Sequence, residues 1–213
     1  MKKTFLLLSF AAALFSCNDH SNHQAAGADS LNHAGHDTTA ATMQNNNAIK
    51  QVMDNMMQGM HSINPTGSND IDFARMMVMH HQGAVEMSKK EISEGTDSSM
   101  KAFAQTVIKD QDKEIKLMEE LIARSPKDPS ANPAGFQKAM NASMMAMMKE
   151  TTLYNNIDKD YAAQMVPHHQ SALDMAKAYL QNGNTKELVT LCNNIISSQT
   201  KEISWLNDWL SKH

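Results

Sequence analysis

Hydrophobic positions recur every three to four residues through most of the chain after residue 47, which is the spacing of amphipathic helices. The breaks between these segments are rich in Gly, Pro, Asn and Asp, which favour turns and helix ends. No stretch shows the strict alternation of a half-buried strand. The pattern therefore predicts an all-α protein, with helices near residues 48–62, 70–94, 98–124, 135–154, 158–182 and 185–211.

The helical pattern repeats at a constant offset of 88 residues, and eleven of twenty positions are identical between residues 70–89 and 158–177. One helical hairpin cannot bury its own apolar face, whereas two hairpins together can form a four-helix bundle. We therefore expect two repeats, 48–124 and 135–213, joined by a linker at 125–134. Each repeat would be a short Met-rich helix followed by a hairpin, and both would form one bundle.

The N-terminal segment predicts export. Residues 1–17 contain two lysines, an apolar run too short for a membrane span, and the sequence "LFSC", which resembles a bacterial lipoprotein signal with Cys17 as the lipidated residue. Residues 18–47 lack aromatics and any apolar period, so they predict a disordered, His-containing tether. The predicted location is a membrane-anchored lipoprotein that faces the periplasm or the cell surface.

The amino-acid composition limits which classes of function the protein can have. A formal net charge of −4 and the absence of a basic run exclude a nucleic-acid surface. Nineteen methionines and ten histidines are high numbers for 213 residues, whereas cysteine occurs only twice. With Cys17 lipidated, Cys192 has no disulfide partner, and its apolar neighbours indicate a buried, inert thiol.

The motif "HHQ" occurs twice, framed by methionines, in "MVMHHQGAVEM" at 77–87 and "MVPHHQSALDM" at 165–175. On a helix, each copy gathers two imidazoles and one or two thioethers near one turn. A lone His on an apolar face is usually a satisfied core residue, and a Met stripe is usually core. The repeated pairing favours metal binding, and the predicted ligands are His80, His81, Met77, Met87, His168, His169, Met165 and Met175.

The sequence also predicts residues that support these ligands. If both helices of a hairpin rise equally per residue from the turn, His81 lies opposite Gln111 and His169 lies opposite Gln199. These glutamines could orient the imidazoles or simply satisfy a polar core pair. The predicted supporting glutamines are Gln82, Gln170, Gln111 and Gln199. The accessory metal ligands on the short Met-rich helices are Met53, Met56, Met57, Met60, His61, Met144, Met145 and Met148.

Thioethers are soft ligands that favour Cu(I), and imidazole accepts both copper oxidation states, so copper is the predicted metal, with silver as its analogue. Glu-x-x-His and His-Glu-x-x-His are absent, which disfavours a di-iron bundle and zinc-protease chemistry. No nucleophile–base set is evident, so catalysis is not required.

The segments "DFARMMVMHHQGAVEM" and "DYAAQMVPHHQSALDM" resemble the bacterial family filed as domain of unknown function 305, over residues 48–212 in two copies. The resemblance implies a ferritin-like helical bundle, an exported location and, in some members, a link to copper binding or resistance. The family often has Pro before His-His-Gln, as at Pro167, whereas the first copy has Met79.

The predicted function is therefore an exported, lipid-anchored copper chaperone or buffer. Its partners would be the membrane, other copper-handling envelope proteins and a second copy of the chain. Two alternatives stay open: a structural or partner-binding bundle with His-His-Gln as a polar core cluster, and a ferritin-like redox enzyme that uses a metal.

Overall fold

The computed structural model describes residues 47–124, 130–148 and 151–213. These residues form helices and connecting segments without strands, and they confirm the predicted all-α bundle. The helices are α2 (Ala48–His61), α3 (Asn69–Glu94), α4 (Ser98–Arg124), α5 (Pro133–Met147), α6 (Ile157–Asn182) and α7 (Lys186–Lys212). The expected signal, Cys17 and the tether up to residue 46 lie outside the described residues.

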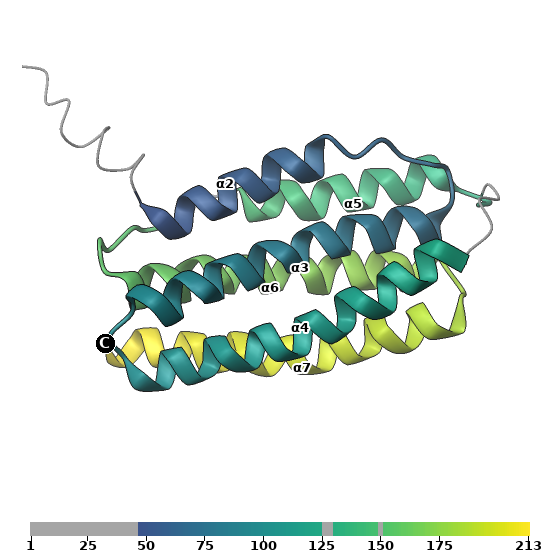
Figure 1. Ribbon diagram of the computed structural model, residues 1–213. Coiled ribbons are helices and arrows are strands. Elements are labelled where there is room, and N and C mark those ends of the chain that lie inside the picture. The colour runs from purple at the N-terminus through teal and green to yellow at the C-terminus, as the bar shows by residue number, and fades with distance from the viewer. Residues whose placement is uncertain (1–46, 125–129, 149–150) are drawn as a thin grey trace, which may run out of the picture. The chain divides into compact units, whose positions relative to one another are not determined.

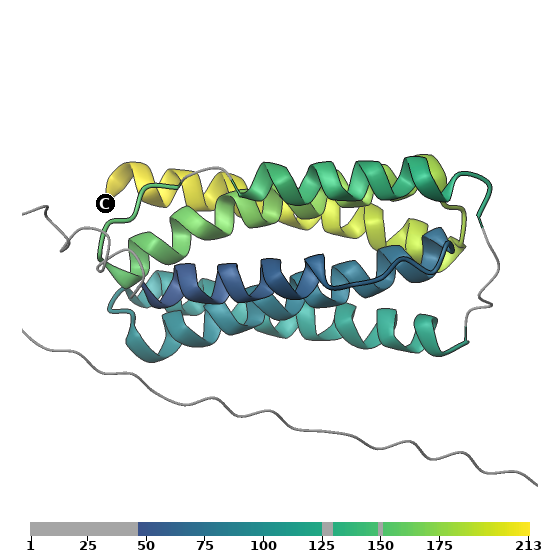
Figure 2. The same cartoon turned by 90° about the horizontal axis from the view of Figure 1, so that it is seen from above.

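The six helices are arranged in three layers. The long helices α3 and α6 form the middle layer, with α4 and α7 on one side and the short helices α2 and α5 on the other (Figure 1). The helices of residues 48–124 lie on one side of the bundle and those of residues 133–212 on the other (Figure 2). The middle layer is consequently covered on both faces, which explains why the motif histidines of α3 and α6 are fully buried.

Two aspartates tie the ends of α3 and α6 to the opposite hairpin. Asp158, near the start of α6, accepts hydrogen bonds from the backbone N–H groups of Thr96 and Asp97, both at 2.9 Å, in the turn after α3. Asp70, near the start of α3, accepts a 2.5 Å hydrogen bond from the Tyr179 hydroxyl at the end of α6. Each helix therefore begins where the other ends, so α3 and α6 are antiparallel.

Helix α5 is shorter than its sequence pattern predicts. It ends at Met147 rather than near residue 154, and residues 151–156 form an irregular segment in which Asn155 has a φ of 52°. Within that segment, the backbone N–H groups of Tyr154 and Asn156 donate to Asp160, at 2.6 and 3.2 Å. These bonds hold the chain against the first turn of α6, in a conformation that a continuing helix could not adopt.

Candidate metal centre

The four motif histidines meet in the middle of the bundle. His80 and His81 come from α3, His168 and His169 come from α6, and all four have no exposed surface. The rings of His80 and His168 lie against each other, with centroids 3.7 Å apart and planes inclined by 35°. Each contacts its own neighbour at a longer distance, 6.1 Å for His80–His81 and 5.9 Å for His168–His169. The imidazoles thus form a row across the α3–α6 interface.

The inner pair, His80 and His168, is held by hydrogen bonds across this interface. Nε2 of His80 lies 2.7 Å from Oγ of Ser171, and Nε2 of His168 lies 3.0 Å from the carbonyl oxygen of His80. Burial lowers the pKa of both imidazoles well below its usual value, and the charges of neighbouring histidines lower it further. Both rings are therefore neutral at pH 7, the form in which imidazole binds metals.

The outer pair faces α4 and α7. Nε2 of His81 lies 2.7 Å from Oε2 of Glu114 on α4. Nε2 of His169 lies 2.9 Å from Oε2 of Glu202 on α7, at an angle outside that of a hydrogen bond. Each glutamate side chain is 21% exposed. A carboxylate thus connects each outer imidazole with the surface of the bundle.

Every one of the four imidazoles leaves its Nδ1 without a partner. Among the described residues, Nδ1 of His80, His81, His168 and His169 is buried and makes no hydrogen bond. A buried polar atom without a partner costs about 1–3 kcal/mol. Four such atoms lie in one interface, and their lone pairs are available as ligands for a metal ion.

The predicted glutamine partners are wrong. Gln82 and Gln170 are exposed, and Gln170 bonds to Asp174 at 3.1 Å. Gln111 and Gln199 are buried, but both polar side-chain atoms of Gln111 and Oε1 of Gln199 have no hydrogen-bond partner among the described residues.

The partner residues lie one helical turn further on, at Glu114 and Glu202. Helical side chains lean towards the N-terminus of their helix, so a glutamate three residues later reaches back to the level of the glutamine. The signal was present in the sequence, because the 88-residue offset also pairs Glu114 with Glu202.

The predicted methionine ligands of the motif, Met77, Met87, Met165 and Met175, are fully buried in the core that surrounds the histidines. Of the accessory set, the side chains buried in this core are Met53, Met56, Met57, Met60 and Met144. His61, Met145 and Met148 are exposed instead.

Two thioethers lie directly against the motif. A Cβ added at Gly83 would lie 2.3 Å from Sδ of Met56, so this methionine fills the space beside the first motif. In the second repeat Ser171 replaces that glycine, and its Oγ lies 3.4 Å from Sδ of Met147. Met147 was not predicted from the sequence, although it lies within the same Met-rich helix.

Cys192 is buried, as predicted, and it is the free cysteine of the described residues. Burial, and then the charge of Glu114, raise the pKa of its thiol to about 12. The thiol therefore stays protonated at neutral pH in the metal-free protein.

A soft ion fits these residues better than a hard one. In the described part of the chain, no group of three or more His, Cys, Asp or Glu side chains is arranged to hold a metal ion. The donors that are available are unpartnered imidazole nitrogens and nearby thioethers, which suit Cu(I) and Ag(I). No described helix is long and apolar enough to cross a bilayer.

The family model described as domain of unknown function DUF305 matches the chain over residues 17–122 and 70–210. No curated protein matches the chain. A solved structure of a secreted DUF305 protein from Streptomyces coelicolor superposes with a TM-score of 0.55, at 24% identity, over 70% of this chain and 95% of that one. At this identity the likeness supports the fold.

Structures of the protein CopM are also similar. CopM in a Cu(II)-bound form superposes with a TM-score of 0.53, at 30% identity, over 67% of this chain and 97% of that one. CopM in a Cu(I)-bound form gives a TM-score of 0.52, at 28% identity, over 67% and 96% of the two chains. A CopM structure with bound silver gives the same TM-score of 0.52, at 28% identity and the same coverage.

Proposed function

The chain belongs to the DUF305 family, and from this premise and the geometry of its histidines we propose that it binds copper or silver ions in the cell envelope. The observation that carries the proposal is the set of four buried Nδ1 atoms without partners, two from α3 and two from α6. Buried lone pairs without a hydrogen-bond donor are stabilised by a cation. The similarity to CopM structures with bound copper and silver supports this choice of ion.

The donor set favours the monovalent ions. The inner imidazoles are neutral, and the sulfur atoms of Met56 and Met147 lie beside the motif residues Gly83 and Ser171. Thioethers bind Cu(I) and Ag(I) and stay available in an oxidising compartment, where thiolate pairs tend to form disulfides. Storage or delivery of the ion requires no reacting group beyond these ligands, so we propose a buffer or chaperone rather than an enzyme.

Export and anchoring are part of the proposal. The "LFSC" sequence at Cys17 supports lipidation, and the Streptomyces relative is described as secreted. A lipid-anchored protein of this kind would exchange its ion with other copper-handling proteins of the envelope. A second copy of the chain is a further candidate partner.

The test is a competition titration of the metal-free protein with Ag⁺ against a chromophoric chelator. We expect tight binding in the wild type and its loss when His80 and His168 are replaced with Asn. His61→Asn is the matched control, because this exposed ring bonds to the carbonyl of Met57 at 2.7 Å, and it should leave tight binding unchanged. Unchanged affinity in the double variant, with lower thermal stability, would instead assign the histidines to the structural alternative.

A further inference from the structure

The partners of the four imidazoles determine which ring nitrogen carries the proton. A carbonyl or carboxylate oxygen can only accept a hydrogen bond, so the nitrogen that faces it must be the donor. Nε2 of His168 faces the carbonyl of His80, and Nε2 of His81 faces the carboxylate of Glu114, both within hydrogen-bond geometry. Nε2 of His169 lies 2.9 Å from a carboxylate oxygen of Glu202 outside that geometry, but the negative charge still favours a proton over a lone pair on this nitrogen. These three rings therefore carry their proton on Nε2.

The partner of His80 is a hydroxyl, which can donate or accept. Ser171 has one hydroxyl proton, and its Oγ lies 3.0 Å from the carbonyl of His168 and 3.4 Å from the sulfur of Met147. When this proton goes to either acceptor, the hydroxyl accepts from Nε2 of His80 at 2.7 Å. All four rings then share one tautomer, with a proton on Nε2 and a bare Nδ1.

The outer rings depend on residues that the family motif does not contain. Glu114 and Glu202 lie on α4 and α7, outside both His-His-Gln segments, and each lies against one buried imidazole. The other ring nitrogen of each outer histidine has no partner among the described residues. The carboxylate is therefore the group that selects the tautomer on each side of the bundle.

We propose that Glu114 and Glu202 are positioning residues that hold His81 and His169 in the Nε2–H tautomer, so that Nδ1 is the nitrogen presented to the metal. The metal part of this inference rests on the proposed function, whereas the tautomer is a property of the metal-free protein. Their negative charges also offset the charge of a bound cation. Removing carboxylates that orient metal-binding histidines typically weakens metal affinity by roughly 10–100-fold.

The experiment is ¹⁵N NMR of the metal-free protein with labelled histidine, in which the two ring nitrogens of each tautomer are distinguished by their shifts and their couplings to the ring protons. We expect Nε2–H signals for all four buried rings. In Glu114→Gln/Glu202→Gln, an amide can accept or donate, so the signals of His81 and His169 should shift towards a mixture of tautomers. The signals of His80 and His168 should keep the Nε2–H pattern.

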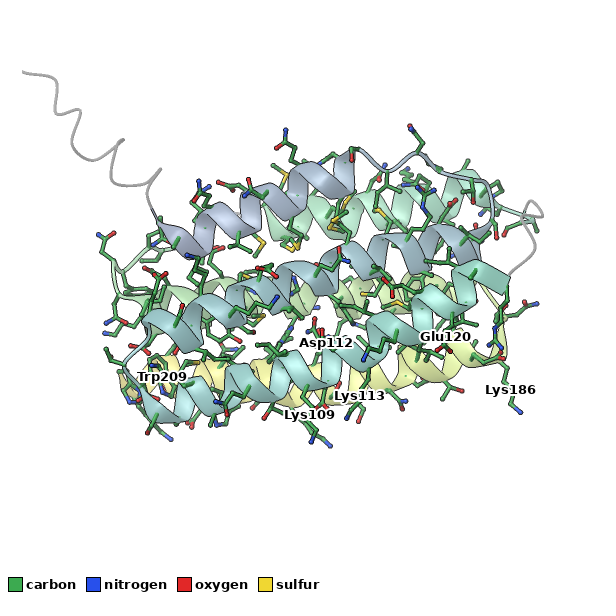
Figure 3. All side chains as sticks on the ribbon, in the orientation of Figure 1. Lys109, Asp112, Lys113, Glu120, Lys186 and Trp209 are labelled. Atoms are coloured by element: carbon green, nitrogen blue, oxygen red, sulfur yellow. The ribbon has the colours of Figure 1, made fainter. Side chains whose placement is uncertain are left out.

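Glu120→Gln is the matched control, because it removes one negative charge from the exposed face of the same helix α4 (Figure 3). It should leave all four tautomers unchanged. An Nδ1–H tautomer at His81 or His169 in the wild type would overturn the proposal. This measurement needs only the wild-type protein. Unchanged tautomers in a folded double variant would also overturn it.

A second measurement separates this inference from the proposed function. Addition of Ag⁺ to the labelled wild type should shift the Nδ1 signals of the outer rings and leave their Nε2 protons in place. In the double glutamine variant we expect the Ag⁺ affinity to fall by roughly 10–100-fold. If Ag⁺ does not bind at all while the tautomers are as expected, the proposed function fails and the positioning role stands. If Ag⁺ binds and shifts Nε2 instead, the positioning role fails and the proposed function stands.

Discussion

Ser171 and Gly83 occupy the same place in the two repeats, yet they give the two histidine pairs different surroundings. Ser171 accepts from His80 and contacts the sulfur of Met147, whereas Gly83 leaves room for Met56. The first site therefore has a thioether in the place where the second has a hydroxyl. The two halves of the centre are related by the repeat, but they are not chemically equivalent.

The space at Gly83 gives a prediction about Met56. In Gly83→Ala, the new Cβ would lie 2.3 Å from Sδ and 2.7 Å from Cγ of Met56, so this side chain must move within a packed core. We expect a loss of about 1–3 kcal/mol in the free energy of unfolding, the usual cost of overpacking, measured with urea. We also expect weaker Ag⁺ binding, because the sulfur is displaced from the motif.

Gly59→Ala is the control for that substitution. Its Cβ would meet only the end of the flexible Met79 side chain, at 3.1 Å, and alanine is favoured over glycine in a helix by about 1 kcal/mol. This variant should be as stable as the wild type or slightly more stable. Equal destabilisation of both variants would contradict the role assigned to the Gly83–Met56 contact.

At the scale of elements, the two ends of the α3–α6 pair are joined in different ways. At one end the Tyr179 hydroxyl donates to Asp70. At the other end, the residue equivalent to Tyr179 in the first repeat is Glu91, which is fully buried next to Asp158. Burial, and then the proximity of the Asp158 carboxylate, raise the pKa of Glu91 to about 8. One joint is consequently a phenol and a carboxylate, whereas the other is a pair of neighbouring carboxyl groups.

This difference predicts a pH dependence of stability. Because the folded pKa of Glu91 is raised above its usual 4.5, its contribution to stability is complete below about pH 4.5 and is lost as the pH rises through about 8. In Glu91→Gln, an uncharged amide replaces the acid, so the decline in stability between pH 5 and pH 9 should be smaller than in the wild type. The measurement is urea unfolding across this pH range.

Glu94→Gln is the control for the pH series, because this exposed glutamate pairs only with Lys90 at the surface. Its pH profile should follow that of the wild type. The residues that face Glu91 also include Asp97 and Lys101 on the side of α4, where the lysine charge acts against the shift. A wild-type profile that is flat from pH 5 to pH 9 would show that Glu91 is not protonated in the folded protein.

The helices could be predicted from the sequence because their signals are local and are repeated after 88 residues. The end of α5 could not, because the chain beyond it is held by backbone hydrogen bonds to Asp160, a contact that periodicity does not encode. The pairing of two histidines within each motif followed from the sequence, whereas the meeting of the two pairs across α3 and α6 is a tertiary contact that the motif does not encode. Glu114, and not Gln111, contacts His81 because the glutamate side chain is long and tilts towards the N-terminus of its helix. A prediction that counts only the rise per residue from the turn ignores both effects.

At the scale of the whole molecule, the proposed anchoring rests on a segment that precedes the bundle. If "LFSC" is a lipoprotein signal, the wild-type mature chain should begin at an acylated Cys17, and mass spectrometry of its N-terminal peptide should show the acyl mass. Cys17→Ser should leave the protein without lipid and away from the membrane fraction. Cys192→Ser is the control, because that thiol is buried in the bundle and should not affect membrane association. A wild-type N-terminus without an acyl group would contradict the anchor.

The proposed metal centre would join the two halves of the bundle, because its imidazoles come equally from α3 and α6. A ligand that binds only the folded state stabilises it by mass action, by about 2.7 kcal/mol when its free concentration is 100 times Kd. Ag⁺ should therefore raise the thermal midpoint of the whole bundle in one transition, and His80→Asn/His168→Asn should abolish this shift. Deletion of residues 18–40 should leave the shift intact, since the tether histidines contribute only weak, pH-sensitive binding. A shift that disappears with the tether but survives in the histidine double variant would place the tight site outside the bundle.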